Sequence, residues 1–253
     1  MSWSSRRQLS IVSGIFILVF IPVAIITFKS VYKAPTCFDN LRNGDEVGVD
    51  CGGSCSLLCK NQTIDPIVLW QRVFEVSPGT YNVMSMVENV NIDAGVESAP
   101  YTFELYNREN VLLASRAGTV RISPKSIMPI IETGLFTDQL TPDRVSFKFG
   151  ENFVWQREVP FVPLLIVKDE ILSNEDSEPR INAVLQNISL EEVEDIKVIV
   201  VVYDENDNAI GTSRTIVESI SKDSNQNIIF TWPQPFKEDI ARFEIIPLYE
   251  SPL

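Results

Sequence analysis

The sequence predicts an all-β protein with an N-terminal transmembrane helix, a small cysteine-rich module and two tandem β-sandwich domains. Three observations support this prediction: an uncharged apolar run, four cysteines close together just after it, and a long-period repeat in the remainder. The expected parts are a cytoplasmic tail at 1–8, the transmembrane helix at 9–28, the cysteine-rich module at 35–60, and sandwich repeats at 64–159 and 160–253.

The apolar run extends from Leu9 to Phe28 and contains no charged residue. A helix of this length spans about 30 Å, which is the thickness of the hydrocarbon core of a bilayer. A cleaved signal peptide is the alternative, but the run is longer than a typical signal core and no A-x-A site follows it. We therefore expect an uncleaved single-pass anchor.

Charge near the anchor does not determine its orientation, because two basic residues precede it and two follow it (Arg6 and Arg7; Lys29 and Lys33). The cysteines decide instead, since disulfides form in oxidising compartments outside the cytoplasm. We expect a cytoplasmic N-terminus and an extracytoplasmic body.

Composition excludes several functions. The net charge is −13 and every charge before Thr36 is basic, so the body is strongly acidic and we expect no nucleic-acid partner. The sequence has no histidine, which removes Ser-His-Asp and Cys-His catalysis and the usual catalytic zinc sites. An acidic cluster at 191–195 offers paired carboxylates for a hydrolase, but we interpret it as a solvated loop. We predict no enzymatic activity and no cofactor other than calcium, which stays open.

The cysteine-rich module has the spacing C-x13-C-x3-C-x3-C, formed by Cys37, Cys51, Cys55 and Cys59. So short a segment cannot bury a core, so we expect two disulfides, with all three connectivities open. A zinc site is a weaker alternative, because C-x2-C pairs and histidine are missing. The hard oxygens of the module suit calcium, although they do not follow the EF-hand order. The candidate calcium ligands are Asp39, Asn43, Asp45 and Asp50; a solvated acidic loop is the other interpretation.

The module resembles the motif C-x-D-G-x-x-N-G-x-E-x-G-x-D-C-G-G-x-C-x-x-C of uncharacterised bacterial single-pass envelope and extracellular proteins. The residues that carry this resemblance are Cys37, Asp39, Asn43, Gly44, Glu46, Gly48, Asp50, Cys51, Gly52, Gly53, Cys55 and Cys59. Asn40 stands where the motif has glycine, and the last gap has three residues instead of two. The resemblance implies a surface module without a known activity.

The body repeats itself with a period of 98 residues, which indicates tandem domains. The matched pairs are Asn89 with Asn187, Arg116 with Arg214, and Arg144 with Arg242, while Tyr106-Asn107 matches Tyr203-Asp204 at 97. Residues 101–106 alternate between apolar and polar, and 196–203 are nearly continuously apolar, as in a central strand. About seven short strands per repeat are typical of an immunoglobulin-like sandwich. The other expected strands are 68–74, 83–88, 111–115, 126–131 and 145–149, and in the second repeat 164–167, 181–186, 210–213, 228–232 and 242–246.

A second resemblance concerns Phe103-Glu104-Leu105-Tyr106-Asn107, which reads F-x-L-Y-[DN]. It is similar to the bacterial FxLYD-type β-sandwich domain, which resembles adhesion-like sandwiches such as CARDB. The second repeat keeps only Val202-Tyr203-Asp204. The resemblance implies fold and location but no activity.

Three further features have a structural and a functional interpretation. Asp204 to Asn208 resembles a calcium loop, but the glycine and glutamate positions are not matched, so we expect a turn. Asn187 begins a glycosylation sequon, but its match to Asn89 favours a structural role in the loop. The tryptophans Trp70, Trp155 and Trp232 are expected in cores, and an exposed pair that binds a glycan is the alternative.

These observations predict a membrane-anchored, extracytoplasmic structural or binding protein. Its expected partners are the membrane and a protein or glycan on the exterior. One alternative is a binding subunit of a membrane complex, whose helix contacts partner helices through Ser10 and Gly14. The other is an extracellular hydrolase, which the missing histidine disfavours.

Overall fold

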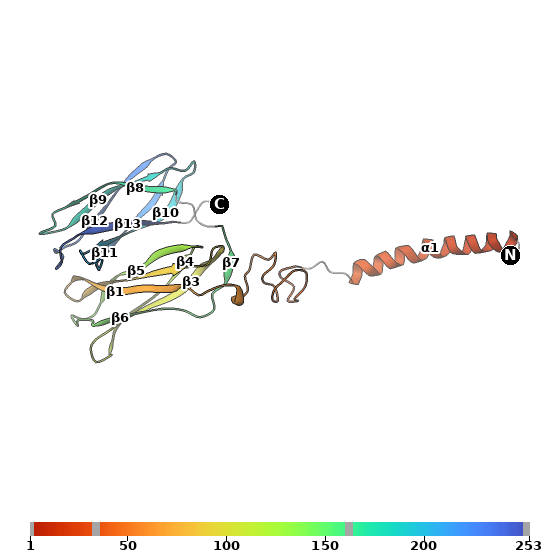
Figure 1. Ribbon diagram of the computed structural model, residues 1–253, viewed down its shortest axis with the longest axis horizontal. Coiled ribbons are helices and arrows are strands. Elements are labelled where there is room, and N and C mark those ends of the chain that lie inside the picture. Colours follow the sequence, from red (N-terminus) through yellow and green to blue (C-terminus); the bar gives the residue numbers. More distant parts are fainter. Residues whose placement is uncertain (1–2, 32–35, 160–163, 250–253) are drawn as a thin grey trace. The chain divides into compact units, whose positions relative to one another are not determined.

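The computed structural model of the protein describes residues 3–31, 36–159 and 164–249, without the side chains of 3–11 and 28–31. The chain divides into two compact units, Met1–Ser56 and Leu57–Leu253. Helix α1 (Trp3–Val31) belongs to the first unit, and the short 3-10 helix η1 (Lys60–Gln62) and strands β1–β13 belong to the second (Figure 1). The predicted boundary between the sandwiches, at residue 160, lies outside the described residues.

Helix α1 contains the predicted anchor. Its described side chains, residues 12–27, are all exposed and none is charged. Thr27 donates its hydroxyl proton to the carbonyl oxygens of Val23 and Ala24, at 2.9 and 3.0 Å. In the part of the chain that the structure describes, we find no helix with the length and hydropathy that crossing a membrane requires. The two ends of the predicted span, 9–11 and 28, lie outside the described side chains, and the span stays a prediction.

The first sandwich consists of two sheets that enclose a core. One sheet has the order β1-β2-β5, and the other has the order β4-β3-β6 with β7 paired to β3. The strands are β1 (Ile67–Ser77), β2 (Thr80–Asn89), β3 (Ala94–Tyr106), β4 (Leu112–Ile122), β5 (Ser126–Phe136), β6 (Arg144–Phe149) and β7 (Trp155–Arg157). Alternate residues of β2 and β3 meet in the core, including Val83, Val87, Phe103 and Leu105, all fully buried.

The second sandwich repeats the topology of β1–β6, and β7 has no counterpart among its described strands. Its sheets have the orders β8-β9-β12 and β11-β10-β13, the counterparts of β1-β2-β5 and β4-β3-β6. The strands are β8 (Leu165–Ser173), β9 (Arg180–Asn187), β10 (Val193–Tyr203), β11 (Ala209–Ile220), β12 (Asn225–Thr231) and β13 (Arg242–Leu248). The all-β prediction is confirmed, and all the expected strands coincide with observed ones, except that Leu164, Val111 and Trp232 fall just outside. The immunoglobulin-like assignment stays a prediction.

The sequence matches correspond to equivalent contacts in the two sandwiches. Arg144 lies over the ring of Tyr106 at 4.4 Å, and Arg242 lies over the ring of Tyr203 at 3.8 Å. In both cases the arginine is the cross-strand partner of the tyrosine. The next residue then caps the turn, because the side-chain oxygen of Asn107 or Asp204 accepts two backbone N–H groups.

The two sandwiches share a third apolar cluster, which we call the inter-sandwich core. Strands β2 and β10 contribute to it with the residues that point away from their own sandwich cores, so both strands are buried on both faces. Its buried members are Phe74, Met84, Met86 and Ile131 from the first sandwich and Ile199, Val201, Tyr203 and Ala209 from the second. The sheet with β1 and β5 thus packs against the sheet with β11 and β13 (Figure 1).

Polar contacts border the inter-sandwich core. Arg72 donates to the carbonyl oxygen of Ala209 at 3.0 Å and to the side-chain oxygen of Asn208 at 2.9 Å. The buried Asn82 side chain donates to the carbonyl oxygen of Thr212 at 3.2 Å. These bonds satisfy polar groups that would otherwise oppose burial of the interface.

Candidate functional site

The cysteine-rich module is the first candidate site, and disulfides hold it together. Cys37 and Cys55 form one disulfide across a sequence separation of 18 residues, and Cys51 and Cys59 are also disulfide-bonded. The disulfide prediction is therefore confirmed, and the zinc alternative is wrong because the sulfurs are not thiolates. Closing a loop of this length contributes about 3 kcal/mol to stability in the chain-entropy account.

The four predicted calcium ligands serve as hydrogen-bonding groups within the loops. The Asp50 carboxylate accepts the backbone N–H groups of Asp39 and Asn40, each at 2.9 Å. The Asp39 carboxylate accepts the N–H of Leu41 and the side-chain amide of Asn43, and the Asn43 bond lowers the pKa of Asp39. Asp45 lies elsewhere in the module and accepts the hydroxyl proton of Ser54 at 2.8 Å.

The structure does not bring the three aspartates together as one ligand set. Among the described residues, the group whose ligand atoms lie within 4.8 Å of one another is Cys37, Glu46 and Cys55. Its two sulfurs belong to the disulfide, so this group offers a metal only the buried Glu46 carboxylate. The side-chain oxygen of Asn43 is buried without a hydrogen-bond partner in the described structure. Calcium binding here stays a prediction.

If calcium binds through Asp45, as the sequence predicts, the Asp45→Ala substitution lowers the calcium affinity of the full chain by roughly tenfold or more, since it removes an oxygen ligand. Calcium titration by calorimetry measures the effect. Asp239→Ala is the matched control, because Asp239 is an exposed aspartate of the second sandwich. Identical titrations for the two variants and the parent chain would eliminate Asp45 as a ligand.

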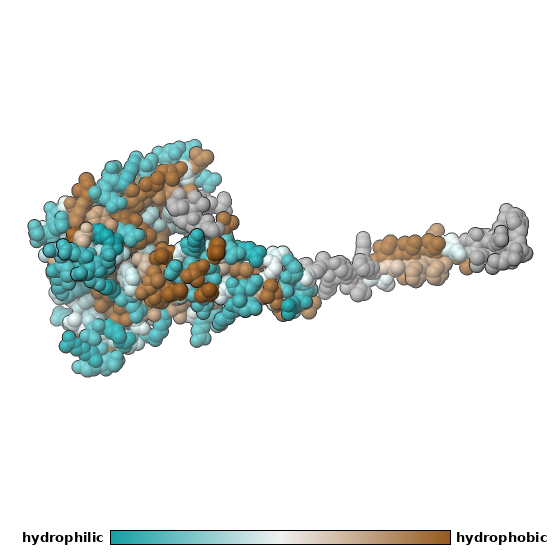
Figure 2. Space-filling view, in the orientation of Figure 1, coloured by the Kyte–Doolittle hydropathy of each residue, from teal (hydrophilic) through white to brown (hydrophobic). Residues whose placement is uncertain are grey.

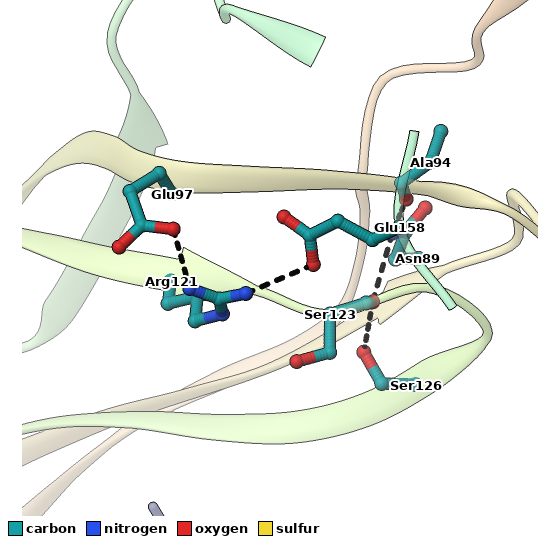
Figure 3. A network of polar contacts seen from close by, with 7 residues as sticks. All are labelled: Asn89, Ala94, Glu97, Arg121, Ser123, Ser126 and Glu158. Atoms are coloured by element: carbon teal, nitrogen blue, oxygen red, sulfur yellow. Dashed lines mark hydrogen bonds and ion pairs between the residues drawn. The ribbon is translucent and has the colours of Figure 1, made fainter. Parts of the chain in front are cut away.

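Asn89 and Asn187 are the second pair of candidates, and both are buried structural residues. Asn89 donates its side-chain N–H groups to the carbonyl oxygens of Ala94 and Ser123, at 2.8 and 2.9 Å (Figure 3). Asn187 donates to the carbonyl oxygens of Glu191 and Ile220, at 2.8 and 2.9 Å. The predicted structural role is confirmed, and the buried Asn187 amide leaves no free group for a glycan.

The other predicted features also occupy structural positions. The Asp204 carboxylate closes a turn by accepting the N–H of Asn208 at 2.7 Å, which lowers the pKa of Asp204. Trp155 and Trp232 are buried in the cores of the two sandwiches, and Trp70 packs against the inter-sandwich core. These tryptophans therefore do not form the exposed aromatic pair expected of a glycan site.

A cleft of about 470 Å³ lies between the two sandwiches, at the ends of β4, β5, β10 and β13. Its rim carries charges of both signs, from Glu97 and Arg121 on the first sandwich and from Asp195 and Lys197 on the second. Arg121 forms ion pairs with Glu97 and Glu158 on either side of it (Figure 3). This cleft cannot be predicted from the sequence, because it arises from the packing of two domains and has no local pattern.

Comparison with known proteins does not identify the chain. No family model matches the sequence, and no curated protein matches it. Similar solved structures include a red sea bream transglutaminase, with a TM-score of 0.22 and 10% identity over 72% of this chain and 31% of that chain. A beta-glucuronidase from glycoside hydrolase family 2 has a TM-score of 0.24 and 12% identity over 87% of this chain and 29% of that chain. A putative beta-galactosidase from Bacteroides fragilis has a TM-score of 0.23 at 10% identity over 69% of this chain and 33% of that chain. The chain thus spans about a third of each. Such low scores establish neither a family nor an activity.

Proposed function

We propose that this chain is a membrane-anchored, extracytoplasmic protein without catalytic activity, whose joined sandwiches act as a structural or binding body. The main support is the surface of α1. Every described side chain from 12 to 27 is exposed and uncharged, and Figure 2 shows hydrophobic residues along this stretch. A helix that is apolar on all sides requires an apolar environment, and a bilayer provides one.

The rest of the chain supports the same proposal. Disulfide-bonded cysteines are typical of proteins outside the cytoplasm, so they favour an exterior module. The inter-sandwich core joins two domains that would otherwise move on a linker, and a rigid pair suits a spacer or a docking body. The chain has no histidine, and Glu97 at the cleft rim is ion-paired with Arg121, so we assign no chemistry to the cleft.

The anchor is tested by placing charges in the middle of the apolar run. We expect Leu18→Arg together with Val19→Arg to move the full chain out of the carbonate-resistant membrane fraction, since each arginine at mid-span costs about 2.5–3.5 kcal/mol of insertion free energy. Leu190→Arg is the control, because Leu190 is 82% exposed on the loop between β9 and β10. Retention of the doubly substituted chain in the membrane would contradict the anchor.

A binding subunit of a membrane complex is the second candidate, and Gly14 favours it. A Cβ atom placed on Gly14 meets nothing within 4 Å, so the helix backbone is open to a close partner there. An unrelated apolar helix in place of α1 distinguishes the two candidates. A simple anchor tolerates this exchange, whereas a subunit with a partner helix loses its complex.

A further inference from the structure

The cysteine-rich module exposes apolar side chains close to the end of α1. We call Phe38, Leu41 and Val49 the apolar tip; they are 78%, 60% and 56% exposed. They belong to two chain segments that the Asp50 carboxylate joins, since it accepts the N–H groups of Asp39 and Asn40. Three large apolar side chains exposed on two joined segments of so small a module are a candidate contact surface.

The apolar tip is fixed in place by covalent and polar bonds. Phe38 follows Cys37, whose disulfide to Cys55 fixes the base of the loop. The N–H of Leu41 is bound by the Asp39 carboxylate at 3.0 Å. Little conformational entropy is therefore lost when this surface binds a partner.

The short chain segment between α1 and the apolar tip indicates that the partner is the membrane surface. Helix α1 ends at Val31 and Phe38 is seven residues later, so Phe38 lies at most about 25 Å from the helix end. If α1 crosses a bilayer, as we propose above, the apolar tip cannot move far from the membrane surface. We propose that the apolar tip inserts into the boundary between headgroups and acyl chains of the outer leaflet, where Phe and Leu side chains of interfacial segments are buried.

The charges of the module determine the kind of lipid. Asp39, Asp45, Glu46 and Asp50 outnumber the single Arg42 in the described residues 36–56, so the module is acidic. An acidic surface is repelled by anionic lipids, and it tolerates zwitterionic ones. The expected contact is therefore with zwitterionic headgroups such as phosphatidylcholine.

Photocrosslinking of the full chain in phosphatidylcholine nanodiscs tests this inference. We expect a photoreactive benzoylphenylalanine in place of Phe38 to give lipid adducts, read by intact mass, at a yield several-fold above that of the same residue in place of Phe136. Phe136 is the matched control, because it is an aromatic residue, 62% exposed at the end of β5, without a short tether to α1. Unreactive cysteines in the non-reduced, denatured sample show that the module is intact.

The outcomes separate this inference from the anchor on which it rests. A chain that stays in the disc but gives no more adduct at position 38 than at position 136 would overturn the insertion of the apolar tip and leave the anchor standing. Crosslinks from position 38 to a second copy of the chain would overturn it as well. A chain that does not enter the disc would instead contradict the proposed function. A higher adduct yield with phosphatidylserine would overturn the zwitterionic assignment.

Discussion

Val201→Glu is expected to separate the two sandwiches without unfolding either of them. Val201 is fully buried in the inter-sandwich core, on the face of β10 that points away from its own sandwich core. A carboxylate there would lie among the apolar members of the inter-sandwich core, and an unpaired buried charge costs about 3–5 kcal/mol. We expect the interface to open, which raises the radius of gyration in small-angle scattering and splits thermal unfolding into two transitions.

The first sandwich shows that the fold itself accepts this substitution. Val201 is paired with Glu244 on β13, and Glu104 is paired with Ser146 on β6, so Val201 and Glu104 hold equivalent positions. Among the described residues, the sheet face that carries Glu104 contributes nothing to the inter-sandwich core, and Glu104 forms an ion pair with Lys148 and accepts the hydroxyl proton of Tyr106. Glu104→Val is therefore the control, and we expect a change within about 1 kcal/mol. Unchanged scattering and a single transition for Val201→Glu would refute the interface.

Asn187→Ala is expected to lower the free energy of unfolding by about 3 kcal/mol, because buried carbonyl groups lose their donors. Its amide is fully buried and donates to the carbonyl oxygens of Glu191 and Ile220, while its oxygen accepts the N–H of Ser189. Alanine cannot replace any of these bonds. Denaturant unfolding monitored by tryptophan fluorescence measures the effect.

The control for Asn187→Ala is Asn227→Ala, on the exposed part of β12. We expect this change to alter stability by less than about 0.5 kcal/mol, as is usual for surface substitutions. Asn89→Ala provides an independent repeat of the experiment, since Asn89 makes the equivalent bonds in the first sandwich. Equal stabilities for Asn187→Ala and Asn227→Ala would show that the loop does not depend on the buried amide.

Much of the fold follows from local patterns in the sequence. The alternation of residues 101–106 predicts a strand with one buried face, and Phe103 and Leu105 are indeed in the core. The 98-residue match of Asn89 to Asn187 predicts a shared loop role, which the buried amides confirm. The first feature depends on neighbouring residues and the second on the internal repeat, so both can be predicted from the sequence.

The remainder depends on contacts between distant residues, which no local pattern specifies. The continuous apolar run at 196–203 predicts a central strand, but it does not say that the second face of β10 packs on Met84 and Met86. Cysteine spacing leaves three connectivities open, and only the fold selects Cys37 with Cys55. In the sequence, the acidic residues of the module suggest calcium ligands. In the structure, the Asp50 carboxylate accepts hydrogen bonds from the backbone N–H groups of Asp39 and Asn40, and no sequence pattern shows these bonds.

The location of the body is tested most directly by the cysteine state of the full chain in cell membranes. The membrane fraction is washed with alkaline carbonate, denatured with a thiol alkylator in the absence of reductant, and analysed by intact mass. Our account predicts that the chain remains in the washed membranes and that all four cysteines are unmodified. Four alkylated cysteines, or a chain that the carbonate wash removes, would contradict an anchored protein with a disulfide-bonded exterior body.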